Sequence, residues 1–149
     1  MEKQTTLARA VQYTDIGLHS GQPVSLELKP APADTGIVFI RADIPDRPAV
    51  RANAGQVTST LRATTLENGE AKVFTVEHLL AALYVLGVDN CQVEMSAAEA
   101  PVGDGSALPF VRLIEQAGIV ELAAPRTVLA VDATVEVADN GRSIKVLPY

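Results

Sequence analysis

The sequence of 149 residues is long enough for one domain with a substantial core, or for one domain and the beginning of another. It carries 12 basic and 18 acidic residues, a net charge of -6, and only 4% aromatic residues. This composition argues against nucleic-acid binding, which needs basic patches and stacking aromatic side chains. No apolar run approaches the ~20 residues of a membrane span, and the N-terminal stretch lacks the continuous apolar segment of a secretion signal. We therefore expect a cytoplasmic protein without a transmembrane segment.

Alternating apolar and polar residues predict strands in the first part of the chain. Segment 23–30 has an apolar residue at every second position, which is the pattern of a half-buried strand. The proline-rich segment 30–36 predicts a turn, and the apolar runs 37–40 and 91–95 predict two more strands. Two prolines, several charges and a glycine in 43–56 indicate loop or edge structure with a short strand at its end.

Two helices are predicted from strong helix formers and their flanking residues. Thr75 is the expected N-cap of a helix over 76–86, which a glycine then ends. This helix is apolar nearly all round, so we expect it to be buried between layers. The second helix is expected to start near Ser106 or Ala107, with Gly118 just beyond its end.

The pattern changes again in the last part of the chain. Alternation over 127–137 predicts a strand, 139–141 is a strong hairpin signal, and 143–147 begins the return strand. A two-stranded hairpin is marginal by itself and needs a further element to cover its apolar face. The expected fold is α+β: a first domain over 1–124, and the opening hairpin of a second, truncated domain over 125–149.

Thr75-Val76-Glu77-His78 is the first candidate for chemistry. An N-cap at Thr75 puts Glu77 and His78 in the first helical turn, where free N–H groups and the helix dipole favour negative charge. Adjacent helical residues point ~100° apart, which suits His78 as a metal ligand and Glu77 as the base that takes a proton from bound water. Alternatively, Glu77 only decorates the helix N-terminus and His78 is structural. With two histidines, one cysteine and no HExxH motif, this chain does not supply the three ligands of a catalytic zinc by itself.

Other polar or reactive segments carry weaker signals. The glycines of 17–21 (GLHSG) let a backbone approach a ligand closely, but they also suit an ordinary turn. Asp104 and Ser106 could bind a polar group, although capping of the second helix by Ser106 is favoured. Segment 61–66 is too polar for a core strand and too poor in glycine for a phosphate loop. Cys91 lies in an apolar strand, where a thiol is usually inert.

Taken in order, these motifs resemble the zinc-dependent UDP-3-O-acyl-N-acetylglucosamine deacetylases of lipid A synthesis, the LpxC family. The resemblance rests on GLHSG at 17–21, LKPAPADTGIVF at 28–39, LRATTL at 61–66, TVEHLLAAL at 75–83, LGVDN at 86–90 and PVGDGSALPFVRLIEQAG at 101–118. It implies two α/β sandwich domains, each a sheet covered by two helices, with the helices of the two domains packed together. This chain would hold the first domain and the first hairpin of the second.

The resemblance also implies roles for named residues. His78 would bind zinc together with a histidine and an aspartate of the second domain, and Glu77 would be the general base that activates zinc-bound water. A second-domain histidine would be the general acid. Five further residues would line the metal pocket or border the substrate cleft: Leu18, His19, Leu61, Arg62 and Ala63.

The implied reaction is hydrolysis of the 2-acetamido group of UDP-3-O-acyl-N-acetylglucosamine, with release of acetate. Because the other zinc ligands would lie beyond residue 149, we expect this chain to be the N-terminal part of such an enzyme and inactive alone. The alternative is a non-catalytic binding or assembly module. An exposed inter-domain face would favour self-association of the isolated chain.

Overall fold

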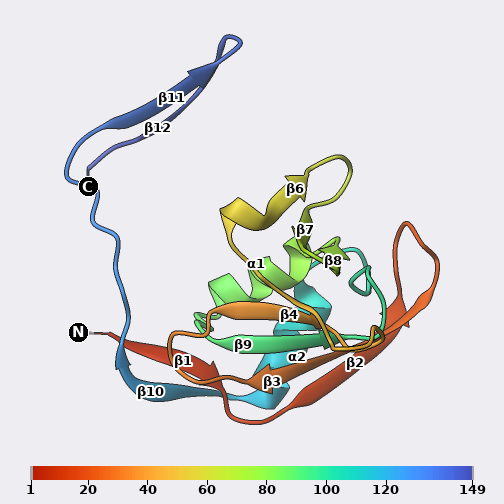
Figure 1. The fold of residues 1–149 in the computed structure, drawn as a ribbon. Helices are drawn as coiled ribbons and strands as arrows, with labels where there is room; N and C mark the ends of the chain where they lie inside the picture. The colour runs from red at the N-terminus through yellow and green to blue at the C-terminus, as the bar shows by residue number, and fades with distance from the viewer. Residues whose placement is uncertain (1, 149) are drawn as a thin grey trace.

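The computed structural model describes residues 2–148, so Met1 and Tyr149, the outer ends of the two expected domains, lie outside the described residues. Over this range the chain has an α+β fold (Figure 1). Its elements are β1 (Lys3–Leu7), β2 (Val11–Ile16), β3 (Pro23–Pro30), β4 (Ile37–Arg41), β5 (Ala49–Arg51), a 3-10 turn η1 (Ala54–Gln56), β6 (Val57–Ser59), β7 (Thr65–Asn68), β8 (Ala71–Phe74), α1 (Glu77–Val85), β9 (Cys91–Met95), α2 (Leu108–Ala117), β10 (Ile119–Pro125), β11 (Val135–Asp139) and β12 (Arg142–Val146).

A five-stranded sheet in the order β2-β3-β9-β4-β5 forms the centre of the fold. β4 and β9 run parallel, and the other neighbouring pairs are antiparallel. The predicted alternation in β3 is confirmed, because Val24, Leu26 and Leu28 are all buried. These side chains point toward the helical layer, so one face of the sheet carries the core.

The two helices complete a two-layer sandwich with this sheet. Phe110 and Ile114 of α2 join Leu79 and Leu83 of α1 in the same buried cluster as the sheet residue Phe39. The predicted sandwich is therefore confirmed. Neither helix of the described residues is long and apolar enough to cross a membrane.

α1 differs from its prediction on one side. Tyr84 is 85% exposed and Val85 is 77% exposed, so the helix is not buried all round. Its other side carries Leu79, Ala82 and Leu83, which are buried in the core that α1 shares with the sheet and with α2. The sheet and α2 leave the opposite side of this largely apolar helix uncovered. α1 therefore presents apolar side chains to solvent.

Two segments far apart in the sequence are held together beside the C-terminal end of α1. β1 pairs antiparallel with β10, a pairing between residues far apart in the sequence. Directly after β10, the guanidinium group of Arg126 donates hydrogen bonds to Asp89 Oδ2 (2.8 Å from Nη2) and to the Gly87 carbonyl (3.2 Å). Arg126 thus fixes the chain beside the end of α1, just before the segment that leads to β11.

The predicted hairpin is present as β11 and β12, and it extends away from the rest of the chain in Figure 1. Asn140 and Gly141 have φ values of 50° and 77°, the two positive values that a type I′ turn requires. The predicted strand over 127–137 is wrong in its first part, because β11 begins at Val135. Only from Val135 onward does β12 offer a partner for the backbone hydrogen bonds. The division into domains 1–124 and 125–149 stays a prediction.

Segment 43–56 contains the short strand β5 and the turn η1, close to the predicted loop and edge structure. Beyond it, β6, β7 and β8 form a separate three-stranded sheet. Figure 1 shows this small sheet beside the N-terminal end of α1. The loop 60–64, which joins β6 to β7, contacts the first turn of α1 through Thr64 and Glu77.

Candidate active site

Segment 98–102 passes between the end of β8 and the end of β2. The last residue of β8 donates a backbone hydrogen bond to the Ala98 carbonyl (2.9 Å) and accepts one from the Ala100 N–H (3.0 Å). On the other side, the Val102 N–H donates to the carbonyl of the last residue of β2 (2.9 Å). These bonds place Glu99 between the strand that leads into α1 and the turn that follows β2.

Glu99 is a buried carboxylate, with 2% of the residue exposed. Its Oε1 accepts hydrogen bonds from the His19 N–H (2.9 Å) and the Thr75 hydroxyl (3.1 Å), and its Oε2 accepts one from the Ser20 N–H (2.7 Å). Burial alone would raise the pKa of Glu99, but the hydrogen bonds from Ser20, His19 and Thr75 outweigh it and hold the pKa below its ordinary value. The carboxylate therefore stays charged at the junction of two motifs.

The prediction that Thr75 is the N-cap of α1 is wrong. Its φ is 57°, in the left-handed region, and the first carbonyl to accept a hydrogen bond from the helix is that of Val76 (from the Leu80 N–H, 3.0 Å). The Thr75 hydroxyl bonds to Glu99, and Val76 takes the N-cap position without a side-chain cap. The helix nevertheless starts at Glu77, so Glu77 and His78 lie in its first turn as predicted.

Glu77 is half-buried and is contacted by the loop between β6 and β7. The Thr64 N–H donates a hydrogen bond to Glu77 Oε2, with an N···O distance of 3.1 Å. The loop 60–64 is thereby fixed to the first turn of α1. The negative charge of Glu77 also lies where the free N–H groups of the helix favour it.

His78 lies beside Glu77 and is half-buried. Among the described residues, no group of three or more His, Cys, Asp and Glu side chains could hold a metal ion. The residues present therefore do not make a complete zinc site. His78 offers one nitrogen ligand, and a catalytic zinc takes three protein ligands.

The remaining predicted site residues lie on two loops. Leu61 is 82% exposed, and Arg62 is exposed with a φ of 63°; with the half-buried Ala63 they precede Thr64, which contacts Glu77. Leu18 and His19 are exposed on the turn that Glu99 holds. Segment 17–21 and Thr75 of the 75–83 motif thus meet at Glu99. Segment 61–66 meets the same 75–83 motif at Glu77.

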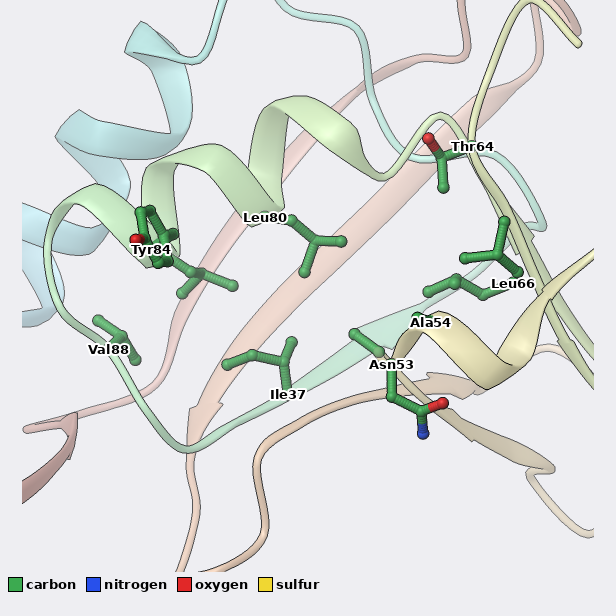
Figure 2. A pocket seen from close by; sticks show the side chains of 11 residues that line it. Ile37, Asn53, Ala54, Thr64, Leu66, Leu80, Tyr84 and Val88 are labelled. Carbon is green, nitrogen blue, oxygen red and sulfur yellow. The ribbon is translucent and has the colours of Figure 1, made fainter. Parts of the chain in front are cut away.

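An apolar cavity of about 410 Å³ adjoins this region between α1 and the small sheet. Figure 2 shows Leu80 and Tyr84 of α1 on one side, with Asn53 and Ala54 facing them and Thr64 at one end. The cavity lining contains no acidic residue and no histidine. The cavity lies next to Glu77 and His78, but neither residue lines it.

Two further predictions concern Ser106 before α2 and Cys91 in β9. Ser106 Oγ accepts a hydrogen bond from the N–H of Leu108, the first residue of α2, and itself donates to Asp104 (2.7 Å). The prediction that Ser106 caps α2 is nevertheless wrong, because Ala107 takes the N-cap position without a side-chain cap. Ser106 lies one residue before it and bonds to the first turn from there. Cys91 is buried, and burial raises the pKa of its thiol to about 12, which leaves it inert.

The sequence pattern of UDP-3-O-acyl N-acetylglycosamine deacetylase (LpxC) matches residues 4–149. The chain belongs to this family. Over all 149 residues it is 49% identical to proteins named UDP-3-O-acyl-N-acetylglucosamine deacetylase from Hahella chejuensis and from Pseudomonas entomophila, and 46% identical to one from Chromohalobacter salexigens. Each match covers 49% of the relative, so the chain spans about half the length of the curated relatives that it matches.

Membership of the LpxC family confirms the resemblance on which the sequence analysis relied. Glu99 was not among the predicted site residues, although it lies between two of the quoted motifs. The only signal in the sequence is an isolated acidic residue in the otherwise small and apolar segment 96–101. A buried carboxylate of this kind needs hydrogen-bond donors from elsewhere in the fold.

Proposed function

We propose that this chain supplies the N-terminal part of a zinc-dependent deacetylase that acts on UDP-3-O-acyl-N-acetylglucosamine in lipid A biosynthesis. In the reaction, water adds to the carbonyl carbon of the 2-acetamido group, the C–N bond breaks, and acetate and the free amine are released. Family membership and the names of the relatives support this proposal. The single observation that carries it is the pair Glu77 and His78 in the first turn of α1, with Glu77 held by the loop 60–64.

Glu77 is the proposed general base, since its carboxylate can take the proton that water loses as it attacks the amide. His78 is the proposed zinc ligand contributed by this chain, and the other ligands come from outside it. Leu18, His19, Leu61, Arg62 and Ala63 are proposed to border the metal and the substrate, in keeping with their exposure or partial burial on two loops near α1.

The isolated chain is proposed to be inactive, because the described residues lack a group of side chains that could hold a metal. We also propose a cytoplasmic location for this reaction. The alternative function is a non-catalytic binding or assembly module, and the exposed apolar side of α1 favours it for the chain by itself.

The test is to join this chain to the remaining half of the Hahella chejuensis relative, or to mix the two parts, and to measure acetate release in the presence of zinc. Activity that needs both parts and disappears in Glu77→Ala supports the deacetylase. A joined protein that folds and binds zinc but releases no acetate supports the non-catalytic module. The chain alone and the added half alone are the controls.

A further inference from the structure

We propose that Glu99 is a positioning residue, which holds the turn 17–21 against the start of α1 and so fixes the substrate-facing residues Leu18 and His19 relative to Glu77 and His78. This inference rests on the proposed function, because it assigns Glu99 a part in the same site. Glu99 itself is buried beneath the turn, so it acts through the residues that it holds.

The first support is the identity of its hydrogen-bond donors. Two backbone N–H groups come from consecutive residues of the turn, His19 and Ser20, and a hydroxyl comes from Thr75 just before α1. Hydrogen bonds to a charged acceptor are stronger than those between neutral groups, and burial strengthens them further. A single carboxylate therefore couples two segments that are distant in the sequence.

The second support is the space left for the carboxylate at Gly17. A Cβ added there would overlap Glu99 Oε2 and Ser20 Oγ, and it would lie 2.8 Å from Glu99 Cδ. Gly17 does not have a positive φ, so the missing side chain matters here for close approach and not for backbone freedom. The turn is shaped around Glu99.

The third support is the backbone of Thr75. A β-branched residue in the left-handed region is strained, and such strain persists only where neighbouring groups hold it. The hydroxyl of Thr75 reaches Glu99 in this conformation, and the helix with Glu77 begins two residues later. Glu99 thus orients the start of α1 as well as the turn.

The first experiment measures amide hydrogen exchange by NMR in the 149-residue chain. Glu99→Gln keeps the shape of the side chain but turns an NH₂ group toward one of the donors. We expect exchange of the His19 and Ser20 amides to speed up by about tenfold or more, with the sheet amides of β3 and β9 unchanged. Glu94→Gln, on β9 and paired with Lys29 and Arg47, is the matched control. Unchanged exchange at His19 and Ser20, or an equal increase throughout the chain, would overturn the proposal.

The second experiment measures kcat and KM in the protein joined to the half from the relative. Glu99→Gln is expected to raise KM by about tenfold or more and to leave the zinc content unchanged. Gly17→Ala is expected to act in the same direction. Wild-type KM and kcat in both variants would overturn the positioning role.

A further pair of variants keeps the test decisive if Glu99→Gln does not fold. Thr75→Val removes the hydroxyl donor, and Thr75→Ser keeps it. We expect KM to rise in Thr75→Val and to stay near the wild-type value in Thr75→Ser. Equal kinetics in the two variants would overturn the proposal. An inactive wild-type joined protein would overturn the proposed function, whereas the exchange rates of His19 and Ser20 separately decide whether Glu99 holds the turn.

Discussion

The backbone N–H of Thr64 donates a hydrogen bond to Glu77 Oε2 across the β7–β8 hairpin that separates the two residues in the sequence (3.1 Å). Holding one carboxylate oxygen fixes the direction in which the other can accept a proton. The loop that carries Leu61, Arg62 and Ala63 is fixed by the same bond. The proposed general base and its loop therefore form one unit at the start of α1.

The division of roles between Glu77 and His78 leads to the first prediction. In the joined protein, Glu77→Ala should lower kcat by about 10²–10⁴-fold, the usual contribution of a general base, and leave zinc bound. His78→Ala should lose the metal. Activity assays together with metal analysis of the purified variants check both statements, and equal zinc loss in the two variants would contradict the division.

The second prediction concerns the apolar side of α1 around Tyr84 and Val85, which are 85% and 77% exposed. An exposed apolar patch favours association, so the isolated chain should self-associate as its concentration rises. Tyr84→Lys should weaken this association in sedimentation velocity. Leu129→Lys, at an exposed apolar residue of the segment after β10, is the control and should have little effect. A wild-type chain that stays monomeric at high concentration would argue against the prediction.

An element of the fold could be predicted when its own sequence pattern showed which face is buried, and not when it depended on a strand partner far away in the sequence. β3 and α2 carry their own periodic patterns, because each buries one face, and both were found where expected. β1 was not predicted, since its only strand partner in the described chain is β10, which lies far along the sequence. A local pattern cannot reveal such a pairing.

The site was predictable to a similar degree. Glu77 and His78 were placed in a helical turn by the helix formers that follow them. The N-cap at Thr75 was wrong, because a tertiary hydrogen bond to Glu99 overrides the usual capping preference of threonine. Glu99 was missed for the same reason, since its donors come from residues distant in the sequence.

The third prediction is a pH dependence of stability from Asp89. Burial alone would raise its pKa, but the hydrogen bonds from Arg126 and from the Thr5 backbone outweigh it, so the pKa lies below the ordinary value. A lowered folded-state pKa stabilises the protein above the unfolded value of about 3.9, and this contribution is lost as the pH falls toward the folded value. Asp89→Asn should therefore be less stable than wild type at pH 7, and the difference should shrink below about pH 4. Urea unfolding from pH 7 to 3 measures this, and a constant difference would contradict it.

The fourth prediction concerns the reactivity of Cys91, the only cysteine of the chain. Burial raises the pKa of its thiol to about 12, so almost no thiolate is present at neutral pH and the sulfur is shielded from reagents. A thiol reagent at pH 8 should label the native chain very slowly and the urea-unfolded chain rapidly. Rapid labelling in native conditions would contradict the buried position of β9.

The central claim is that His78 forms a zinc site together with ligands from outside this chain. Its most direct test is the affinity and stoichiometry of zinc binding by metal-stripped protein. The isolated chain should bind zinc weakly, because the proposed ligand His78 would be one of three and the described residues hold no group of metal ligands. The joined protein should bind one zinc tightly and lose it in His78→Ala. Tight binding of one zinc by the isolated chain, or its retention by the joined His78→Ala variant, would contradict the account.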